Sequence, residues 1–148
     1  MWFSVVTGGT LLVLSALLGT CAKLSAVLVV DAANVVGSRP NGWWRDRPAA
    51  ARDLTSRVRR ATAEGSLARP VVLVLEGAAR NGVEEGVVDG VEVVHALGEG
   101  DDTVAAIAAE AAEDVFVVTA DRRLSQRVRG SGAEVFGPNW LLDRLPSL

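Results

Sequence analysis

The sequence predicts an α/β domain with a mostly parallel sheet of about five strands. From residue 25 onward, short apolar runs alternate with helical patterns, which is typical of βα units. The runs are apolar at almost every position, as expected for strands that are buried on both faces. A chain of 148 residues has room for one such domain with its own core.

The predicted elements follow one another in chain order. The first strand covers residues 26–30, and a helix covers 48–65, where Leu54, Val58 and Ala61 repeat on one face. The remaining elements are a strand over 70–77, a strand over 91–96, a helix over 101–114, a strand over 115–121, a helix over 122–132, a short strand over 133–137 and a terminal helical turn over 139–145.

An apolar extension over residues 1–24 precedes the predicted domain, which covers 25–148. The extension is long enough for a membrane helix, but no positive region precedes its apolar run and Lys23 is the first cation. Three interpretations stay open: a membrane anchor or uncleaved signal, an extra helix packed on the domain, and an upstream extension outside the functional unit. The single cysteine, Cys21, excludes an internal disulfide and multi-cysteine metal sites. We therefore expect a cytoplasmic protein, with membrane anchoring through residues 1–24 as the alternative.

The arginines are concentrated in two groups, although the net charge is −3. The net charge argues against a protein that coats nucleic acid through bulk charge. The two groups still leave a local phosphate-binding surface open, and solvated helix faces are the alternative interpretation. The first group is Arg39, Arg45, Arg47, Arg52, Arg57, Arg59 and Arg60, and the second is Arg122, Arg123, Arg127 and Arg129.

Acidic side chains follow the predicted strands at the point where each strand ends. Asp31 ends the first strand, Glu76 ends the second, Asp101 and Asp102 follow the third, and Asp121 follows the fourth. Open α/β sheets bind ligands at this edge, and hard ions such as Mg²⁺ prefer oxygen ligands. Aspartate is also a common N-cap, which explains Asp121 and one of Asp101 and Asp102 more easily than it explains Asp31.

Three motifs together resemble the NYN branch of the PIN-like nuclease superfamily, particularly its small YacP-type single-domain members. They are DAANVVG at 31–37, GDDTVAAIA at 100–108 and VVTADRRL at 117–124, and the resemblance covers about residues 25–145. The resemblance implies a small Rossmann-like, PIN-like three-layer sandwich. It also implies metal-dependent RNA cleavage, and hence an endoribonuclease.

The resemblance implies catalytic roles for four aspartates and one asparagine. Asp31 would be the metal ligand at the end of the first strand, with Asn34 as its polar partner. Asp121 would be the acid after the fourth strand. One of Asp101 and Asp102 would face the metal while the other caps the helix, and the choice between them stays open.

Two positions depart from the family pattern. Ala32 and Ala33 stand where the family's Asp-Gly-Tyr-Asn type motif carries its aromatic residue, so this chain lacks the family's usual aromatic contact near Asn34. Glu76 has no secure counterpart and is a second-tier candidate. The expected cofactor is Mg²⁺ or Mn²⁺, which would activate water and offset charge on the phosphate.

The loop GSRPNGWWRDR suggests contacts with RNA. Trp43 and Trp44 would stack on unpaired bases while Arg45 and Arg47 meet phosphates, as in recognition of single-stranded RNA. Burial of the tryptophans over the core, of Trp44 especially, is the alternative interpretation. Arg122 is a further candidate phosphate contact. The expected partner is RNA, either single-stranded or ribosome-associated.

Two other functions fit the same residues. A nucleoside triphosphate (pyro)phosphohydrolase would keep the metal site and change the substrate, because function depends on the site more than on the fold. A catalytically inactive RNA-binding module would keep the surface and lose the metal. The chain has no glycine-rich phosphate loop in the required strand-to-helix context, and we expect the lone His95 to be structural.

Overall fold

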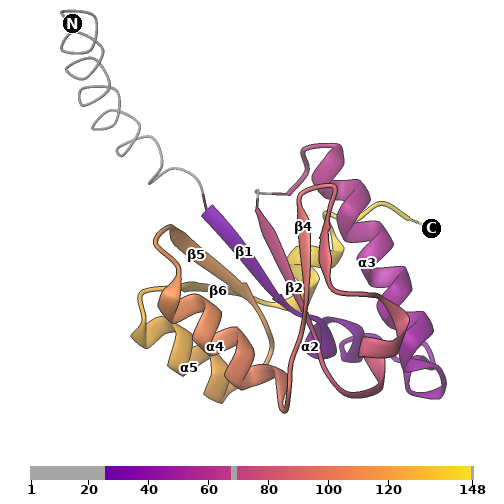
Figure 1. Cartoon of the computed structure of the whole chain (residues 1–148), viewed down its shortest axis with the longest axis horizontal. Helices are drawn as coiled ribbons and strands as arrows, with labels where there is room; N and C mark the ends of the chain where they lie inside the picture. Colours follow the sequence, from indigo (N-terminus) through magenta and orange to yellow (C-terminus); the bar gives the residue numbers. More distant parts are fainter. Residues whose placement is uncertain (1–25, 68–69, 148) are drawn as a thin grey trace, which may run out of the picture.

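The computed structural model describes residues 26–67 and 70–147, and the predicted apolar extension over 1–24 lies outside them. A six-stranded sheet in the order β3-β4-β2-β1-β5-β6 carries helices on both faces (Figure 1). Its strands are β1 (Ala26–Asp31), β2 (Val71–Leu75), β3 (Gly86–Val88), β4 (Val91–His95), β5 (Asp114–Val118) and β6 (Glu134–Phe136). The helices are α2 (Ala32–Gly37), α3 (Arg47–Ala63), α4 (Gly100–Glu110), α5 (Arg122–Gly130) and α6 (Pro138–Leu142), with short 3-10 helices η1 (Trp43–Arg45) and η2 (Gly77–Gly82).

The predicted three-layer α/β architecture is confirmed. Strand β1 lies between β2 and β5 and pairs with both in parallel. Leu28 and Val30 pack into one core with residues of α2, α3 and α6, whereas Val27 and Val29 pack into a second core with residues of α4 and α5. This alternation is the two-residue period of a strand, so a continuously apolar sequence fills both layers.

The sixth strand, β3, was not predicted. It is a three-residue edge strand that runs antiparallel to β4, and Asp89 and Gly90 form the two-residue turn between them with φ of 53° and 77°. An Asp-Gly pair is favoured there because both turn residues need positive φ. The hairpin explains how the chain moves from β2 to the parallel β4 without a full crossover helix.

Helix α2 was not predicted either, because no element was assigned to residues 32–36 and the loop was expected over 37–47. It begins directly after β1 and brings residues 32–37 over the carboxyl end of the sheet. The ends of β1, β2, β4 and β5 lie at this same edge, because all four strands are parallel. Within the described residues, no helix combines the length and apolar character needed to cross a membrane.

Gly82 makes a close approach between η2 and α3. A Cβ atom at this position would lie 2.1 Å from the carbonyl oxygen of Pro48, so a side chain requires the backbone to move. We expect Gly82→Ala to lower the free energy of unfolding by about 1 to 3 kcal/mol, the usual range for overpacking. Gly98→Ala is the control, because an added Cβ meets no atom within 4 Å there. Equal urea midpoints for the two variants would contradict this close packing.

Candidate functional site at the carboxyl edge of the sheet

Asp31 is a buried carboxylate at the end of the central strand. Its side chain is 3% exposed, and its Oδ1 accepts a hydrogen bond from the backbone N–H of Asn34 (3.4 Å). Its Oδ2 accepts from Asn34 Nδ2 (2.6 Å) and from Thr119 Oγ1 (3.0 Å). Burial raises the pKa of Asp31, and this effect outweighs the hydrogen bonds from Thr119 and Asn34, which lower it.

Asp31 is also the N-cap of α2. The expectation that capping explains this residue less easily was therefore wrong. The reason is the unpredicted helix: with α2 starting at Ala32, the carboxylate meets the unpaired backbone N–H groups of a first helical turn. Capping uses Oδ1, and Oδ2 is held by two side chains, so Asp31 has a fixed orientation.

Thr119 connects Asp31 with Asp121. Its hydroxyl donates to Asp31 Oδ2 and accepts from the backbone N–H of Asp121 (3.1 Å). Beside it, the backbone N–H of Ala120 donates to Asn34 Oδ1 (3.3 Å). The segment after β5 is thus tied to β1 and α2, and the acids that end two strands lie on the same side of the molecule. Sequence reasoning missed Thr119, although a hydroxyl between an apolar strand and an aspartate is a recognisable signal.

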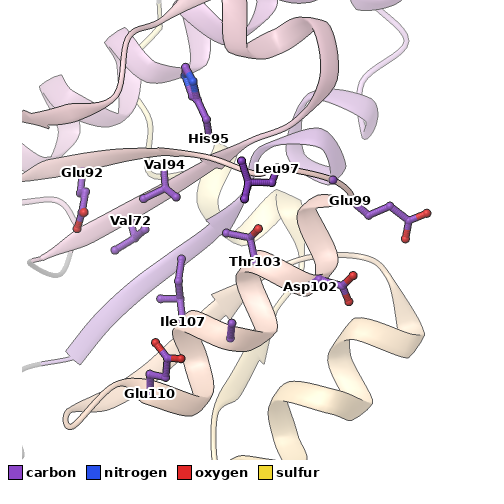
Figure 2. A pocket seen from close by; sticks show the side chains of 12 residues that line it. Val72, Glu92, Val94, His95, Leu97, Glu99, Asp102, Thr103, Ile107 and Glu110 are labelled. Carbon is purple, nitrogen blue, oxygen red and sulfur yellow. The ribbon is translucent and has the colours of Figure 1, made fainter.

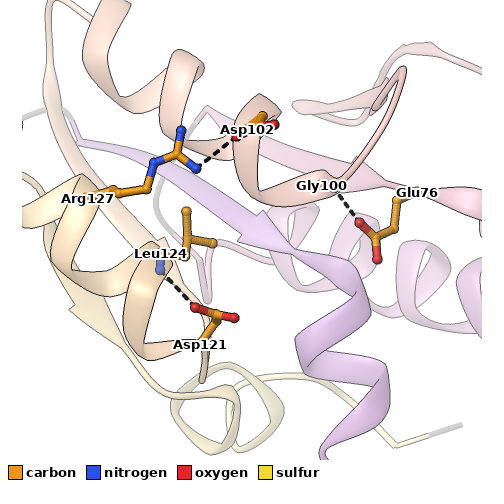
Figure 3. A network of polar contacts seen from close by, with 6 residues as sticks. All are labelled: Glu76, Gly100, Asp102, Asp121, Leu124 and Arg127. Carbon is orange, nitrogen blue, oxygen red and sulfur yellow. Dashed lines mark hydrogen bonds and ion pairs between the residues drawn. The ribbon is translucent and has the colours of Figure 1, made fainter.

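Asp121 is the N-cap of α5. Its Oδ1 accepts from the backbone N–H of Leu124 at 2.8 Å (Figure 3). The capping interpretation is therefore correct for this residue. Among the hydrogen bonds of the described residues, none involves Asp121 Oδ2, so capping leaves one carboxylate oxygen available for a ligand.

Asp101 and Asp102 have different surroundings, although they are neighbours in the first turn of α4. Glu99 is the N-cap of this helix and no side chain caps it, so the expectation that one aspartate caps the helix was wrong. Asp102 is exposed, and its Oδ1 forms an ion pair with Nη1 of Arg127 in α5 at 2.9 Å (Figure 3). Desolvation by burial raises the pKa of Asp101, and the negative charges of Asp121, Asp31, Glu76 and Glu99 raise it further.

Glu76 joins these acids from the end of β2. One oxygen of its carboxylate accepts a hydrogen bond from the backbone N–H of Gly100, at the start of α4 (Figure 3). Its charge contributes to the raised pKa of both Asp31 and Asp101. The second-tier candidate thus lies in the same electrostatic neighbourhood as the acids from β1, α4 and the end of β5.

The donor set suits a hydrated divalent ion better than a closed metal cage. Within residues 26–67 and 70–147, no three His, Cys, Asp or Glu side chains are grouped closely enough to hold one metal ion. Mg²⁺ commonly keeps several waters and takes only one or two carboxylates from the protein, with phosphate oxygens completing its shell. Asp101 and Asp121 offer carboxylate oxygen, and an added cation would relieve the repulsion that raises the pKa of Asp101.

The predicted RNA-binding residues differ in how far they are exposed to solvent. Trp43 is partly buried, and the guanidinium of Arg47 lies 5.5 Å from its ring centre. Trp44 meets Trp43 edge to face at a centroid distance of 6.1 Å and is 53% exposed. Arg45 is exposed on η1, and Arg122 is exposed at the first position of α5, directly after Asp121. Complete burial of both tryptophans, the alternative interpretation, therefore does not hold for Trp44.

A groove of about 490 Å³ lies between α4 and β4, on the side of α4 away from Asp121 (Figure 2). Its apolar residues include Val72, Val94 and Ile107, and its lining residues contain no lysine or arginine. The carboxylates that line it are Glu92, Glu99, Asp102 and Glu110. This charge repels a polyanion, so the groove is a poor path for an RNA backbone.

His95 also lines this groove. Its Nε2 lies 2.8 Å from the carbonyl oxygen of Val83, and its backbone N–H donates to Glu85 Oε1 (2.6 Å). These contacts hold the end of β4 against the segment before β3. They agree with the structural role expected from the sequence.

No protein-family model and no curated protein matches the chain. Two crystal structures of Rae1 (YacP) from Bacillus subtilis share its fold. The first, of a mutant, is 20% identical with a TM-score of 0.59 over 80% of this chain and 73% of that protein. The second is 18% identical with a TM-score of 0.59 over 79% and 71% of the two chains. At these identities the likeness shows the fold alone, and that fold is consistent with the YacP-type resemblance.

Asp101 gives a test of the charge repulsion. Because its pKa is raised above 3.8, its ionisation costs stability as the pH rises through that raised value, and the cost is absent below 3.8. We expect metal-free Asp101→Asn to be more stable than the wild type at neutral pH by about 0.5 kcal/mol, since solvent screens a partly exposed group. The difference should vanish near pH 3.8. Urea unfolding at both pH values measures it.

Asp102→Asn is the matched control for that measurement. It removes the ion pair with Arg127 and should leave stability at neutral pH unchanged or slightly lower. A stabilisation of both variants by the same amount would contradict the different surroundings of the two aspartates.

Thr119 gives a test of the link between the two strand ends. Thr119→Val removes a buried hydroxyl and leaves Asp31 Oδ2 and the Asp121 N–H each short of a partner. We expect a loss of about 1 to 3 kcal/mol in the free energy of unfolding, the usual cost of unsatisfied buried groups. Thr119→Ser keeps the hydroxyl and should retain most of the stability. If guanidinium unfolding placed both variants at the wild-type midpoint, the link would be energetically unimportant.

Proposed function

We propose that this protein is a metal-dependent ribonuclease that hydrolyses RNA phosphodiester bonds at the acidic edge of its sheet. The observation that carries the proposal is the gathering of acids around Asp101, whose pKa is raised by burial and further by the charges of Asp121, Asp31 and Glu76. These four acids come from four separate segments, and none of them takes part in an ion pair within the described residues. Such a cluster costs stability unless a cation or a shared proton relieves it.

Asp101 and Asp121 would hold Mg²⁺ or Mn²⁺ together with water, and Glu76 and the buried Asp31 would add negative charge beside the ion. When bound, such an ion supplies positive charge against the phosphate oxygens and lowers the pKa of water. Asp102 is engaged with Arg127, so we assign it to support of α4 against α5.

The surrounding residues hold the carboxylates in place. Asn34 and Thr119 fix Oδ2 of Asp31, and burial keeps water away from all but a small part of that side chain. The backbone N–H of Leu124 fixes one oxygen of Asp121. Fixed ligands need no reorganisation when charge develops on the reacting phosphate, which is the main source of catalysis in such sites.

RNA is the substrate that the neighbouring side chains suit. Trp43 and Trp44 would stack on unpaired bases, and Arg45, Arg47 and Arg122 would contact phosphates on either side of the acids. The acidic groove beyond α4 would turn the backbone toward this side. The motif resemblance points to the same substrate class, and the fold shared with Rae1 (YacP) is consistent with that resemblance.

An RNA-binding module without catalysis is the second candidate. It is favoured by one observation: no three metal-ligating side chains of the described residues form a ready-made group. In that case the tryptophans and arginines would act alone, and divalent ions would change neither RNA binding nor stability.

Incubation of the full chain with mixed single-stranded RNA and Mn²⁺ tests the proposal. We expect cleavage that chelation stops and that Asp121→Asn slows by at least about 100-fold, the scale for losing one electrostatic group in an active site. Asparagine is as good an N-cap as aspartate, so α5 should persist. Gel analysis of end-labelled RNA measures the rates.

Asp114→Asn is the control, because Asp114 is exposed at the amino end of β5, the strand that Asp121 follows. It should cleave at the wild-type rate. Equal cleavage by wild type and Asp121→Asn would refute the site, whereas RNA binding without cleavage by any form would favour the binding module.

A further inference from the structure

A cavity of about 200 Å³ lies beside the acidic edge, between α2, η1, α3 and η2. Small side chains create it: Ala32 and Ala33 come from α2, Ala51 from α3 and Ala79 from η2. Ala32 and Ala33 are the two positions where the sequence departs from the aromatic residue of the family motif. A larger side chain at either alanine would therefore fill part of this cavity.

The cavity lies next to the proposed nuclease site and shares Glu76 with it. Ala32 directly follows Asp31, and Glu76 both lines the cavity and raises the pKa of Asp31 and Asp101. A group bound in the cavity would thus be a near neighbour of a phosphate held by the acids.

The lining carries one carboxylate, Glu76, and one guanidinium, Arg47 at the rim, and beside the ring of Trp43 it favours a flat neutral ring over a phosphate. Trp43 provides an aromatic wall, and its ring is also the surface on which the Arg47 guanidinium rests at 5.5 Å. The Glu76 carboxylate would repel an anion. One of its oxygens is occupied by the Gly100 N–H, and within the described residues no hydrogen bond involves the other, which remains an acceptor. A heterocycle that carries N–H groups would stack on the Trp43 ring and donate a hydrogen bond to the free oxygen of Glu76.

We propose that this cavity binds one nucleobase of the RNA substrate, next to the phosphate that is cleaved. The proposal rests on the proposed ribonuclease function and adds a base-specificity pocket to it. Its volume is below the range of about 300 to 1,000 Å³ for sites that take drug-sized ligands, so it suits a single base. Arg47, exposed at its rim, is placed to meet the phosphate on the outer side of that nucleotide.

Binding of mononucleotides to the full chain tests the pocket without RNA cleavage. In Mg²⁺ buffer, we expect at least one of AMP, GMP, CMP and UMP to bind about tenfold or more tightly than ribose 5-phosphate, which lacks a base; stacking alone supplies a difference of this size. Titration calorimetry measures the affinities. Equal affinity for ribose 5-phosphate and all four nucleotides would overturn the pocket.

Two neighbouring alanines of η2 provide a matched pair of variants. Ala79 lines the cavity, whereas Ala78 is exposed and does not. Ala79→Leu should remove the advantage of the nucleotides over ribose 5-phosphate and raise KM for RNA about tenfold, while kcat changes little. Ala78→Leu should behave as the wild type. If thermal unfolding shows that Ala79→Leu does not fold, Ala33→Leu fills the cavity from the exposed side of α2.

The two proposals fail in different ways. RNA cleavage with the same KM in Ala79→Leu and Ala78→Leu would overturn the base pocket and leave the nuclease intact. Base-dependent mononucleotide binding that only Ala79→Leu abolishes, in a protein that cleaves no RNA, would support the pocket and overturn the nuclease.

Discussion

The buried carboxylate of Asp31 is the constraint on which the acidic edge depends. A charge at this depth is costly, and its hydrogen bonds from Asn34 and Thr119 offset only part of that cost. The same bonds tie β1, α2 and the segment after β5 into one unit. The position of Asp121, the start of α5 and the turn into α2 therefore all follow from how one side chain is satisfied.

Charge divides the surroundings of this edge into two regions. Beyond α4, the groove beside β4 is apolar with carboxylates and lacks arginine and lysine among its lining residues. On the side of α2 and η1, Trp43 and Arg47 lie next to an alanine-lined cavity. A nucleic acid that approaches the acids meets repulsion on one side and stacking surfaces with cations on the other. Under the proposed function, side chains outside the acid cluster would determine the direction of approach.

The sequence predicts the layers well, because continuous apolar runs identify strands buried on both faces. It does not reveal α2, whose six residues are too few to display a helical period. The edge strand β3 was missed because its strand is short, although the Asp89-Gly90 turn is a hairpin signal. The two apolar residues of β3, Val87 and Val88, lie among glycines and acidic residues, so they did not form a recognisable apolar run.

The site was predictable in part. The strand-end aspartates follow from the parallel topology, but the choice between Asp101 and Asp102 depends on the rotation of α4. Val104 and Ala108 are the buried side chains of that helix, three and seven residues after Asp101, so Asp101 shares their face and Asp102 does not. This periodicity was available in the sequence. Thr119 is recognisable as a hydroxyl ahead of an aspartate, but its hydrogen bond to Asp31 joins residues 88 apart in the sequence and could not be predicted from it.

The central claim is that these carboxylates together attract a divalent ion, and titration of the metal-free protein with Mn²⁺ by calorimetry tests it most directly. The account predicts saturable binding by the wild type and by Asp102→Asn, and binding at least about tenfold weaker by Asp101→Asn, which loses about 1.4 kcal/mol or more. Absence of binding to the wild type, or equal affinities for all three proteins, would contradict it.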